Sequence, residues 1–152
     1  PYYYHVASPQ TYQIFYDWFG NPDNSLRVGD VYWETGVAAP EPYLGDKLAY
    51  YGGTLAYDIY LRYTDGITYP AVALNAGSVS IYYELPSPPV TAWHRISVPL
   101  TEAGWKFNDT NAAVDQASFQ EILSNLIGVY IATEWHSGDD DTNIDNVTLS
   151  PP

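Results

Sequence analysis

Apolar and polar residues alternate over much of this chain, which is the pattern of β-strands that bury one face. The longest alternation covers residues 54–63. Its two expected faces are an inner one of Leu55, Tyr57, Ile59, Leu61 and Tyr63 and an outer one of Thr54, Ala56, Asp58, Tyr60 and Arg62. Shorter runs predict further strands at 12–16, 26–33, 71–75, 78–83, 94–100, 129–135 and 144–149. Their expected inward side chains are Val72, Leu74, Val79, Ile81, Ile96, Val98 and Leu100.

One segment has helical rather than alternating spacing. Its apolar residues recur at intervals of three and four, as on one face of an α-helix: Phe119, Ile122, Leu123 and Leu126. Two residues fit the N-cap, namely Asp115, and Ser118 with Glu121 at capping-box spacing. The sequence therefore predicts one short helix.

About eight short strands and one helix predict an all-β fold, a two-sheet antiparallel jelly-roll sandwich with one short helix. No internal repeat or linker divides residues 1–152, so we expect a single domain. A chain of 152 residues can bury enough surface to fold without a metal or a disulfide. Aromatic residues make up 16% of the chain, and their flat rings favour strands.

The charge balance restricts the partners. The chain has 18 acidic residues, five Lys and Arg, and a formal net charge of −13. A surface this acidic repels phosphate backbones and anionic lipid, which argues against nucleic acid and membrane surfaces. Neutral sugars, divalent cations and basic partners stay compatible with it. No apolar run approaches the ~20 residues of a membrane span, so we expect no membrane insertion.

Several separated motifs resemble the laminin B domain, also called laminin IV type A. They are Val31-Tyr-Trp-Glu-Thr-Gly-Val-Ala-Ala-Pro40, Tyr43-Leu-Gly-Asp-Lys-Leu48, Tyr51-Gly-Gly-Thr-Leu-Ala-Tyr57, Trp93 with Val98-Pro-Leu100, Glu102-Ala-Gly-Trp105, and Asp145-Asn-Val-Thr-Leu149. The resemblance covers about residues 26–149. It implies a jelly-roll sandwich similar to carbohydrate-binding modules, in a secreted or cell-surface protein. The family's usual first strand has no clear match here.

A candidate ligand surface lies on the outer face of the 54–63 strand, where Asp58, Tyr60 and Arg62 share one side. An aromatic ring can stack on a sugar, and flanking charged groups can bind its hydroxyls. Tyr130 and Glu134 have the outward phase of another strand and would extend this surface. The alternative is a solvated Asp58–Arg62 pair with Tyr60 packing across strands.

The tryptophans divide by context. Trp135 lies beside the acidic turn and is a candidate ligand platform, although its phase with Val129 and Ile131 favours burial. Trp93 and Trp105 match the family motifs and are expected to pack in the core or at its rim.

A calcium site is a second candidate. The acidic turn holds Asp139, Asp140 and Asp141, with Asp145 close by, and Asp30 or Asp17 from the other end of the chain would add oxygen ligands. Calcium takes six to eight such oxygens. The alternative interpretation is an acidic turn that is simply solvated.

Catalysis finds little support. The three histidines lack the spacing of a zinc site, and neither a nucleophile elbow nor a phosphate-binding loop occurs. We therefore expect no enzyme.

Two functions remain. The first is a noncatalytic extracellular module that binds glycan. The second is an adhesion, matrix or filament subunit that assembles through protein contacts, such as strand addition at an open sheet edge.

Overall fold

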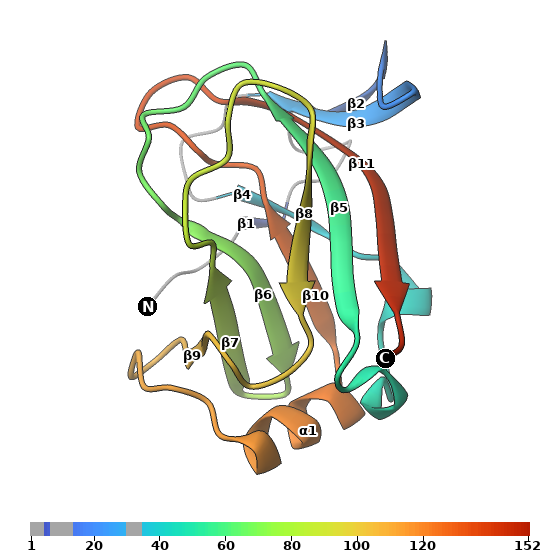
Figure 1. Ribbon diagram of the computed structural model, residues 1–152, viewed down its shortest axis with the longest axis vertical. Helices are drawn as coiled ribbons and strands as arrows, with labels where there is room; N and C mark the ends of the chain where they lie inside the picture. The colour runs from blue at the N-terminus through green and yellow to red at the C-terminus, as the bar shows by residue number, and fades with distance from the viewer. Residues whose placement is uncertain (1–4, 7–13, 30–34) are drawn as a thin grey trace.

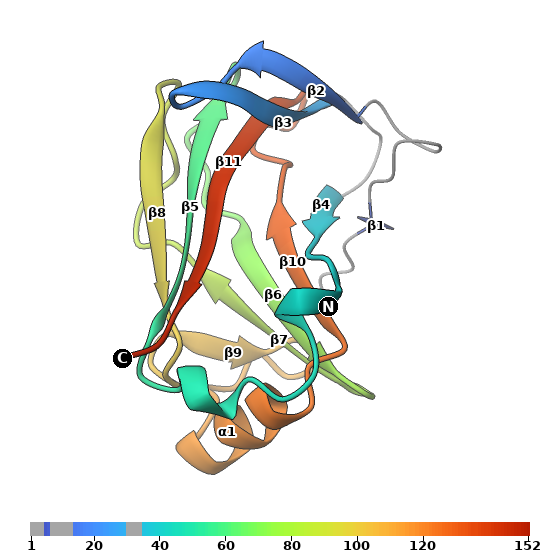
Figure 2. The same cartoon turned by 90° about the vertical axis from the view of Figure 1, so that its right-hand side faces the viewer.

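The computed structural model describes residues 5–6, 14–29 and 35–152, and within this part the chain forms two stacked β-sheets (Figures 1 and 2). One sheet has five strands in the order β2-β3-β11-β5-β8 and the other has six in the order β1-β4-β10-β6-β7-β9. All pairs are antiparallel except β1 with β4. The all-β sandwich predicted from alternation is confirmed. No helix in the described part is long and apolar enough to cross a membrane.

The five-stranded sheet consists of β2 (Ile14–Phe19), β3 (Asp23–Gly29), β11 (Asp141–Ser150), β5 (Thr54–Leu61) and β8 (His94–Pro99). The six-stranded sheet consists of β1 (His5–Val6), β4 (Thr35–Ala38), β10 (Gly128–Ala132), β6 (Pro70–Ala76), β7 (Val79–Glu84) and β9 (Trp105–Phe107). The alternation missed β1, β4 and β9, which have four residues or fewer and are too short to show a period.

Strand β5 supplies much of the core. Leu55, Tyr57, Ile59 and Leu61 alternate along it, and each is at most 1% exposed. This is the inner face that the alternation predicts. Tyr63 is the exception, because β5 ends at Leu61 and leaves the Tyr63 side chain 50% exposed. The prediction that Tyr63 points inward is therefore wrong.

The β6–β7 hairpin adds Val72, Leu74 and Ile81 to the core. Gly77 lies in its turn with φ of 61°, in the left-handed region that favours glycine. Val79, also expected inside, is 40% exposed and is the first residue of β7 after this turn. That expectation is also wrong.

Helix α1 (Gln116–Ser124) closes one end of the sandwich. Asp115 is its N-cap, and its carboxylate accepts a hydrogen bond from the backbone N–H of Ser118 at 2.9 Å. The N-cap of α1 is therefore Asp115 and not Ser118. Phe119, Ile122 and Leu123 are buried in the core, as their spacing predicts. Two 3-10 helices, η1 (Glu41–Tyr43) and η2 (Leu48–Tyr50), precede β5.

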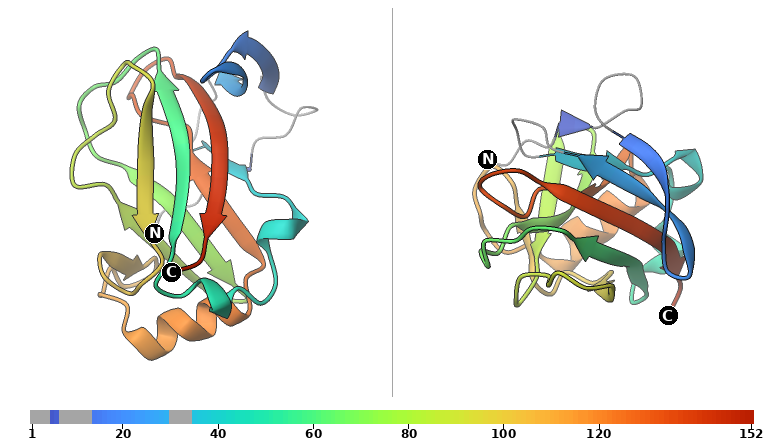
Figure 3. Two further views of the ribbon diagram at one scale, coloured as in Figure 1. Left: turned by 45° about the vertical axis from the view of Figure 1, so that its right-hand side comes forward. Right: turned by 90° about the horizontal axis from the view of Figure 1, so that it is seen from above.

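The β2–β3 hairpin lies at the opposite end from α1 (Figure 3). Its strands differ from the predicted ones, since β2 runs on to Phe19 and β3 already begins at Asp23. Residues 12–13 and 30–33 of the predicted strands lie outside the described residues. The sheet order places β3 beside β11 and leaves β2 at the sheet edge. This hairpin shapes the candidate surface.

Candidate ligand-binding surface

The tip of the β2–β3 hairpin folds onto the outer face of β5. Asp58 on that face accepts hydrogen bonds from Asn21 in the hairpin turn (Nδ2–Oδ2, 3.2 Å) and from Asn146 on β11 (Nδ2–Oδ2, 2.8 Å). Arg95 on β8 donates to its other oxygen at 3.0 Å. The Asp58 residue is only 6% exposed as a result. Its carboxylate joins the hairpin to three strands.

Tyr60, two residues along β5, lies in an aromatic cluster. The ring of Phe19 from β2 meets it edge-on at 4.8 Å between centroids, and Trp93, which precedes β8, lies 5.7 Å away. Phe19 and Trp93 also contact each other at 5.4 Å. Such pairs stabilise beyond the area they bury. Tyr60 therefore packs the hairpin against the sheet. Trp93 packs in this cluster on the outer face and not in the core or at its rim, so the expectation for Trp93 is wrong, whereas Trp105 is buried in the core as expected.

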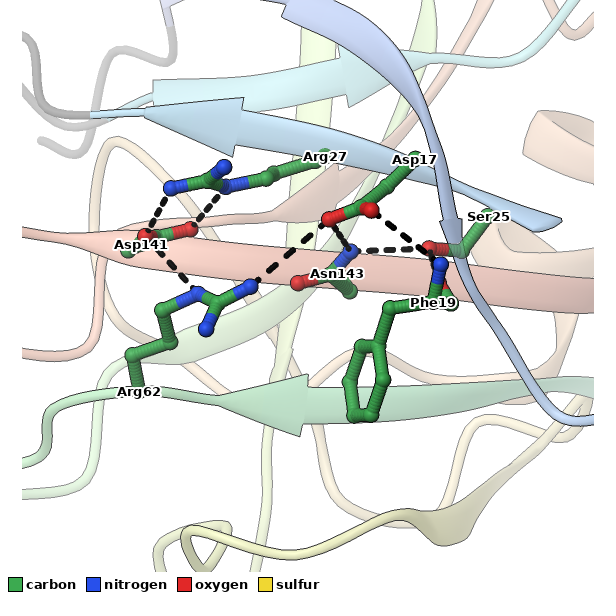
Figure 4. A network of polar contacts seen from close by, with 7 residues as sticks. All are labelled: Asp17, Phe19, Ser25, Arg27, Arg62, Asp141 and Asn143. Atoms are coloured by element: carbon green, nitrogen blue, oxygen red, sulfur yellow. Dashed lines mark hydrogen bonds and ion pairs between the residues drawn. The ribbon is translucent and has the colours of Figure 1, made fainter.

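A charged network continues the same face (Figure 4). Asp141 on β11 accepts a hydrogen bond from Arg27 on β3 (Nε–Oδ1, 2.7 Å) and forms an ion pair with Arg62, the residue that follows β5 (Nε–Oδ2, 2.9 Å). Arg62 also reaches Asp17 on β2, at 3.6 Å between Nη2 and Oδ2. Asn143, which is fully buried, donates to the same Asp17 oxygen at 3.3 Å. Two carboxylates thus balance two guanidinium groups across β2, β3, β11 and the residue that follows β5.

The network shifts the pKa of two of its members. The backbone N–H of Phe19, which donates to Asp17 at 3.1 Å, lowers the pKa of that carboxyl. The hydrogen bond to Asp141 raises the pKa of the Arg27 guanidinium. Both shifts favour the charged forms of Asp17 and Arg27.

The six residues predicted to bind a ligand do not form one surface. Asp58, Tyr60 and Arg62 do share one face, but each has partners within the fold, which matches the packing alternative more than the ligand interpretation. Arg62 pairs with Asp141 and Asp17 rather than with Asp58. Their role in binding stays a prediction.

The other three residues lie elsewhere. Tyr130 is on β10 of the six-stranded sheet, whose outer face points away from that of β5, so it does not extend the same surface. Glu134 follows β10 and is half-buried. Trp135 is fully buried, with its indole N–H donating to the Ala132 carbonyl at 3.2 Å. The prediction that Trp135 contacts a ligand is wrong, and its phase along the strand indicated the burial correctly.

The carboxylates proposed for calcium have other partners. Asp141 is paired with two arginines, Asp145 accepts the backbone N–H of Asn21 at 2.9 Å, and Asp140 accepts that of Trp135 at 2.8 Å. Asp139 is exposed, and Asp30 lies outside the described residues. In the described part, no three His, Asp or Glu side chains group in a way that could hold a metal ion. Calcium binding stays a prediction from the sequence.

Two exposed aromatic side chains were missed. Tyr16 and Trp18 on β2 are 91% and 89% exposed. They lie two residues apart and therefore on one face of the strand, opposite to Asp17 and Phe19. The sequence does contain a hint of this face, because Asp17 is the one polar residue in the aromatic run at 15–19. One polar position is too few to show which aromatic side chains point outward, so the orientation of the strand could not be assigned from the sequence.

Comparison with known proteins gives three similar ones. Human laminin subunit alpha-1 is 26% identical over 133 residues, which is 82% of this chain and 4% of the laminin chain. The L4b domain of human laminin alpha-2 has the same fold with a TM-score of 0.75, at 20% identity, over 84% of this chain and 79% of that domain. A family 30 carbohydrate-binding module has a TM-score of 0.59, at 12% identity, over 91% of this chain and 75% of the module.

The family model for laminin B (domain IV) matches residues 32–151. That range contains the central strand of the five-stranded sheet, β11, its neighbour β5, and the helix that closes the core. Laminin B domains and their carbohydrate-binding neighbours in structure are noncatalytic modules. This chain therefore belongs to the laminin B (domain IV) family.

Proposed function

We propose that this domain is an extracellular module that binds a neutral glycan without catalysis, through Tyr16 and Trp18. The observation that carries the proposal is the exposure of both rings on one face of β2. Large aromatic side chains are costly to leave in water, and exposed ones together mark interaction sites. The two Cα atoms lie roughly 7 Å apart along the strand, from its rise per residue, which suits stacking on consecutive sugar rings.

The chemistry around the pair favours a neutral sugar. A ring face attracts the C–H face of a pyranose, and the phenol and indole N–H can bond its hydroxyls. The net charge of −13 disfavours sulfated or carboxylated glycans. The likeness in fold to a family 30 carbohydrate-binding module supports the class of ligand, and the match to laminin supports an extracellular setting.

A glycan microarray with neutral and sulfated glycans tests this proposal. We expect wild type to bind neutral glycans, and Trp18→Ala and Tyr16→Ala to bind at least about ten-fold more weakly. Ile127→Ala is the matched control, because Ile127 is 61% exposed and lies next to β10, away from β2. Wild type that binds no glycan, or a Trp18→Ala variant that binds like Ile127→Ala, would rule this surface out.

A second candidate is assembly with a matrix protein or another copy of the chain. Strand β2 is the terminal strand of the five-stranded sheet in the described part of the chain. Such an edge can accept an added strand, and Tyr and Trp are enriched among residues that dominate protein interfaces. Sedimentation velocity at high concentration separates the two functions. A concentration-dependent dimer that Trp18→Ala abolishes, without glycan binding, would favour assembly.

A further inference from the structure

Residues of the β6–β7 turn, β9 and α1 line a groove. These elements lie together at the end of the molecule opposite the β2–β3 hairpin (Figure 1). The groove consists of two adjoining hollows of about 460 and 320 Å³ that share Val79 and Phe107. Volumes of this order hold a few side chains. The groove is separate from Tyr16 and Trp18, which lie on the hairpin at the far end.

The floor of the groove is apolar. Val79 is 40% exposed on β7, and the half-buried Phe107 on β9 lies beside it. Ile122 of α1 adds a third apolar side chain to the second hollow. A β-branched side chain exposed at the base of a groove is a surface that an aliphatic group can cover, because covering it removes apolar area from water.

The charges on the rim are all negative. Asp109 lines the first hollow and Glu121 the second, and no lysine or arginine lines either one. Within the described part of the chain, neither carboxylate is in an ion pair. Lys106 is next to Phe107 in sequence but belongs to the other face of β9, where it pairs with Glu84 at 2.7 Å. The rim is therefore left with uncompensated negative charge.

We infer that this groove binds a basic peptide segment in which lysine or arginine alternates with an aliphatic residue. The aliphatic side chain covers Val79 and Phe107, and the flanking cations reach Asp109 and Glu121. Long basic side chains suit the rim because their methylene stems lie along apolar surface while the charged end meets a carboxylate. The net charge of the whole chain adds long-range attraction for the same class of partner.

Fluorescence anisotropy with a labelled hexapeptide of alternating lysine and valine tests the inference. We expect the Asp109→Asn/Glu121→Gln double variant to bind at least about ten-fold more weakly than wild type. The matched control is Glu41→Gln/Asp139→Asn, which removes the same charge from exposed positions outside the groove. It should bind within about two-fold of wild type. Equal weakening in both double variants would show a diffuse charge effect and overturn the proposal.

Two further measurements locate the peptide. A hexapeptide of alternating serine and valine should bind much more weakly, and equal binding by it would also overturn the proposal. Amide NMR shifts should move at Val79, Phe107 and Glu121 on titration, while Trp18→Ala leaves the affinity unchanged. A dimer in sedimentation velocity that Val79→Arg abolishes would mean that a second copy occupies the groove, contrary to the inference.

Discussion

Arg95 on β8 and Asp58 on β5 are direct cross-strand partners, and their side chains meet at 3.0 Å on the outer face of the sheet. The other oxygen of Asp58 accepts hydrogen bonds from Asn21 and Asn146, which come from the hairpin turn and from β11. A single carboxylate, 6% exposed, thereby ties the β2–β3 hairpin to β5, β8 and β11. Its role is structural.

We predict that Asp58→Asn lowers the free energy of unfolding by about 2 kcal/mol, because hydrogen bonds to a charged group are each worth about 1.5–3 kcal/mol. The amide keeps the shape of the side chain but loses the charge that Arg95 pairs with. Urea denaturation followed by circular dichroism measures the change. Asp139→Asn, at an exposed position, should stay within about 0.5 kcal/mol of wild type. Equal stability of the two variants would contradict the role given to Asp58.

Substitutions of Tyr60 and Trp18 should affect stability differently, because Tyr60 packs within the fold and Trp18 is exposed for binding. Tyr60 packs against Phe19 and Trp93, so Tyr60→Ala removes a ring from a cluster and should cost about 2 kcal/mol of unfolding free energy. Trp18 is 89% exposed, and Trp18→Ala should change stability by less than about 0.5 kcal/mol. Thermal melts of the two purified variants provide the comparison. A Tyr60→Ala protein with the wild-type melting temperature would show that the cluster does not hold the hairpin.

Tyr57 carries a hydroxyl in an apolar position. The residue is fully buried, its hydroxyl has no hydrogen-bond partner among the described residues, and desolvation raises the pKa of the phenol. We predict that Tyr57→Phe stabilises the fold by about 1 kcal/mol, because an unsatisfied buried polar group costs about 1–3 kcal/mol. Guanidinium unfolding measures this. A loss of stability of similar size would mean that the hydroxyl has a bound water as its partner.

The sequence predicted the sandwich and its core well, because apolar residues at every second position of a strand point to the same face and mark the face that is buried. Leu55, Ile59, Val98 and Ile131 are all buried in the core, as their periodicity requires. The errors occurred at strand ends: Tyr63 follows the last residue of β5, and Val79 is the first residue of β7. Alternation in the sequence does not show where a strand stops, so it does not predict the exposure of side chains at strand ends.

The candidate surface was harder to predict because its contacts are long-range. Asp58 and Arg62 have the outward phase that predicts solvent exposure, yet Asn21 and Asp17 from a hairpin far earlier in the chain cover or pair with them. No local pattern shows that a hairpin folds over an outer face. Similarly, Tyr130 has the right phase on β10, but phase alone does not tell which of the two sheets contains the strand.

The final prediction concerns Asp65, in the loop between β5 and β6. Its carboxylate accepts the backbone N–H of Ile67 at 2.8 Å and of Ser137 at 3.0 Å, and the hydroxyl of Tyr69 at 2.8 Å. These bonds, the one from Ile67 first, lower the pKa of Asp65 below the ordinary value of 3.8. A carboxyl with a lowered pKa in the folded state contributes stability above its unfolded-state pKa. That contribution disappears as the pH falls through the folded-state pKa.

Asp65→Asn should therefore be less stable than wild type at neutral pH, and the difference should shrink as the pH falls below about 4. Melting temperatures of both proteins between about pH 7 and pH 3 measure it. The Glu41→Gln variant should keep a nearly constant offset over the same range, because Glu41 is exposed in η1 and lies in neither of the two loops that Asp65 joins. An Asp65→Asn difference that stays constant down to about pH 3 would show that the charge of Asp65 does not link this loop to Ser137.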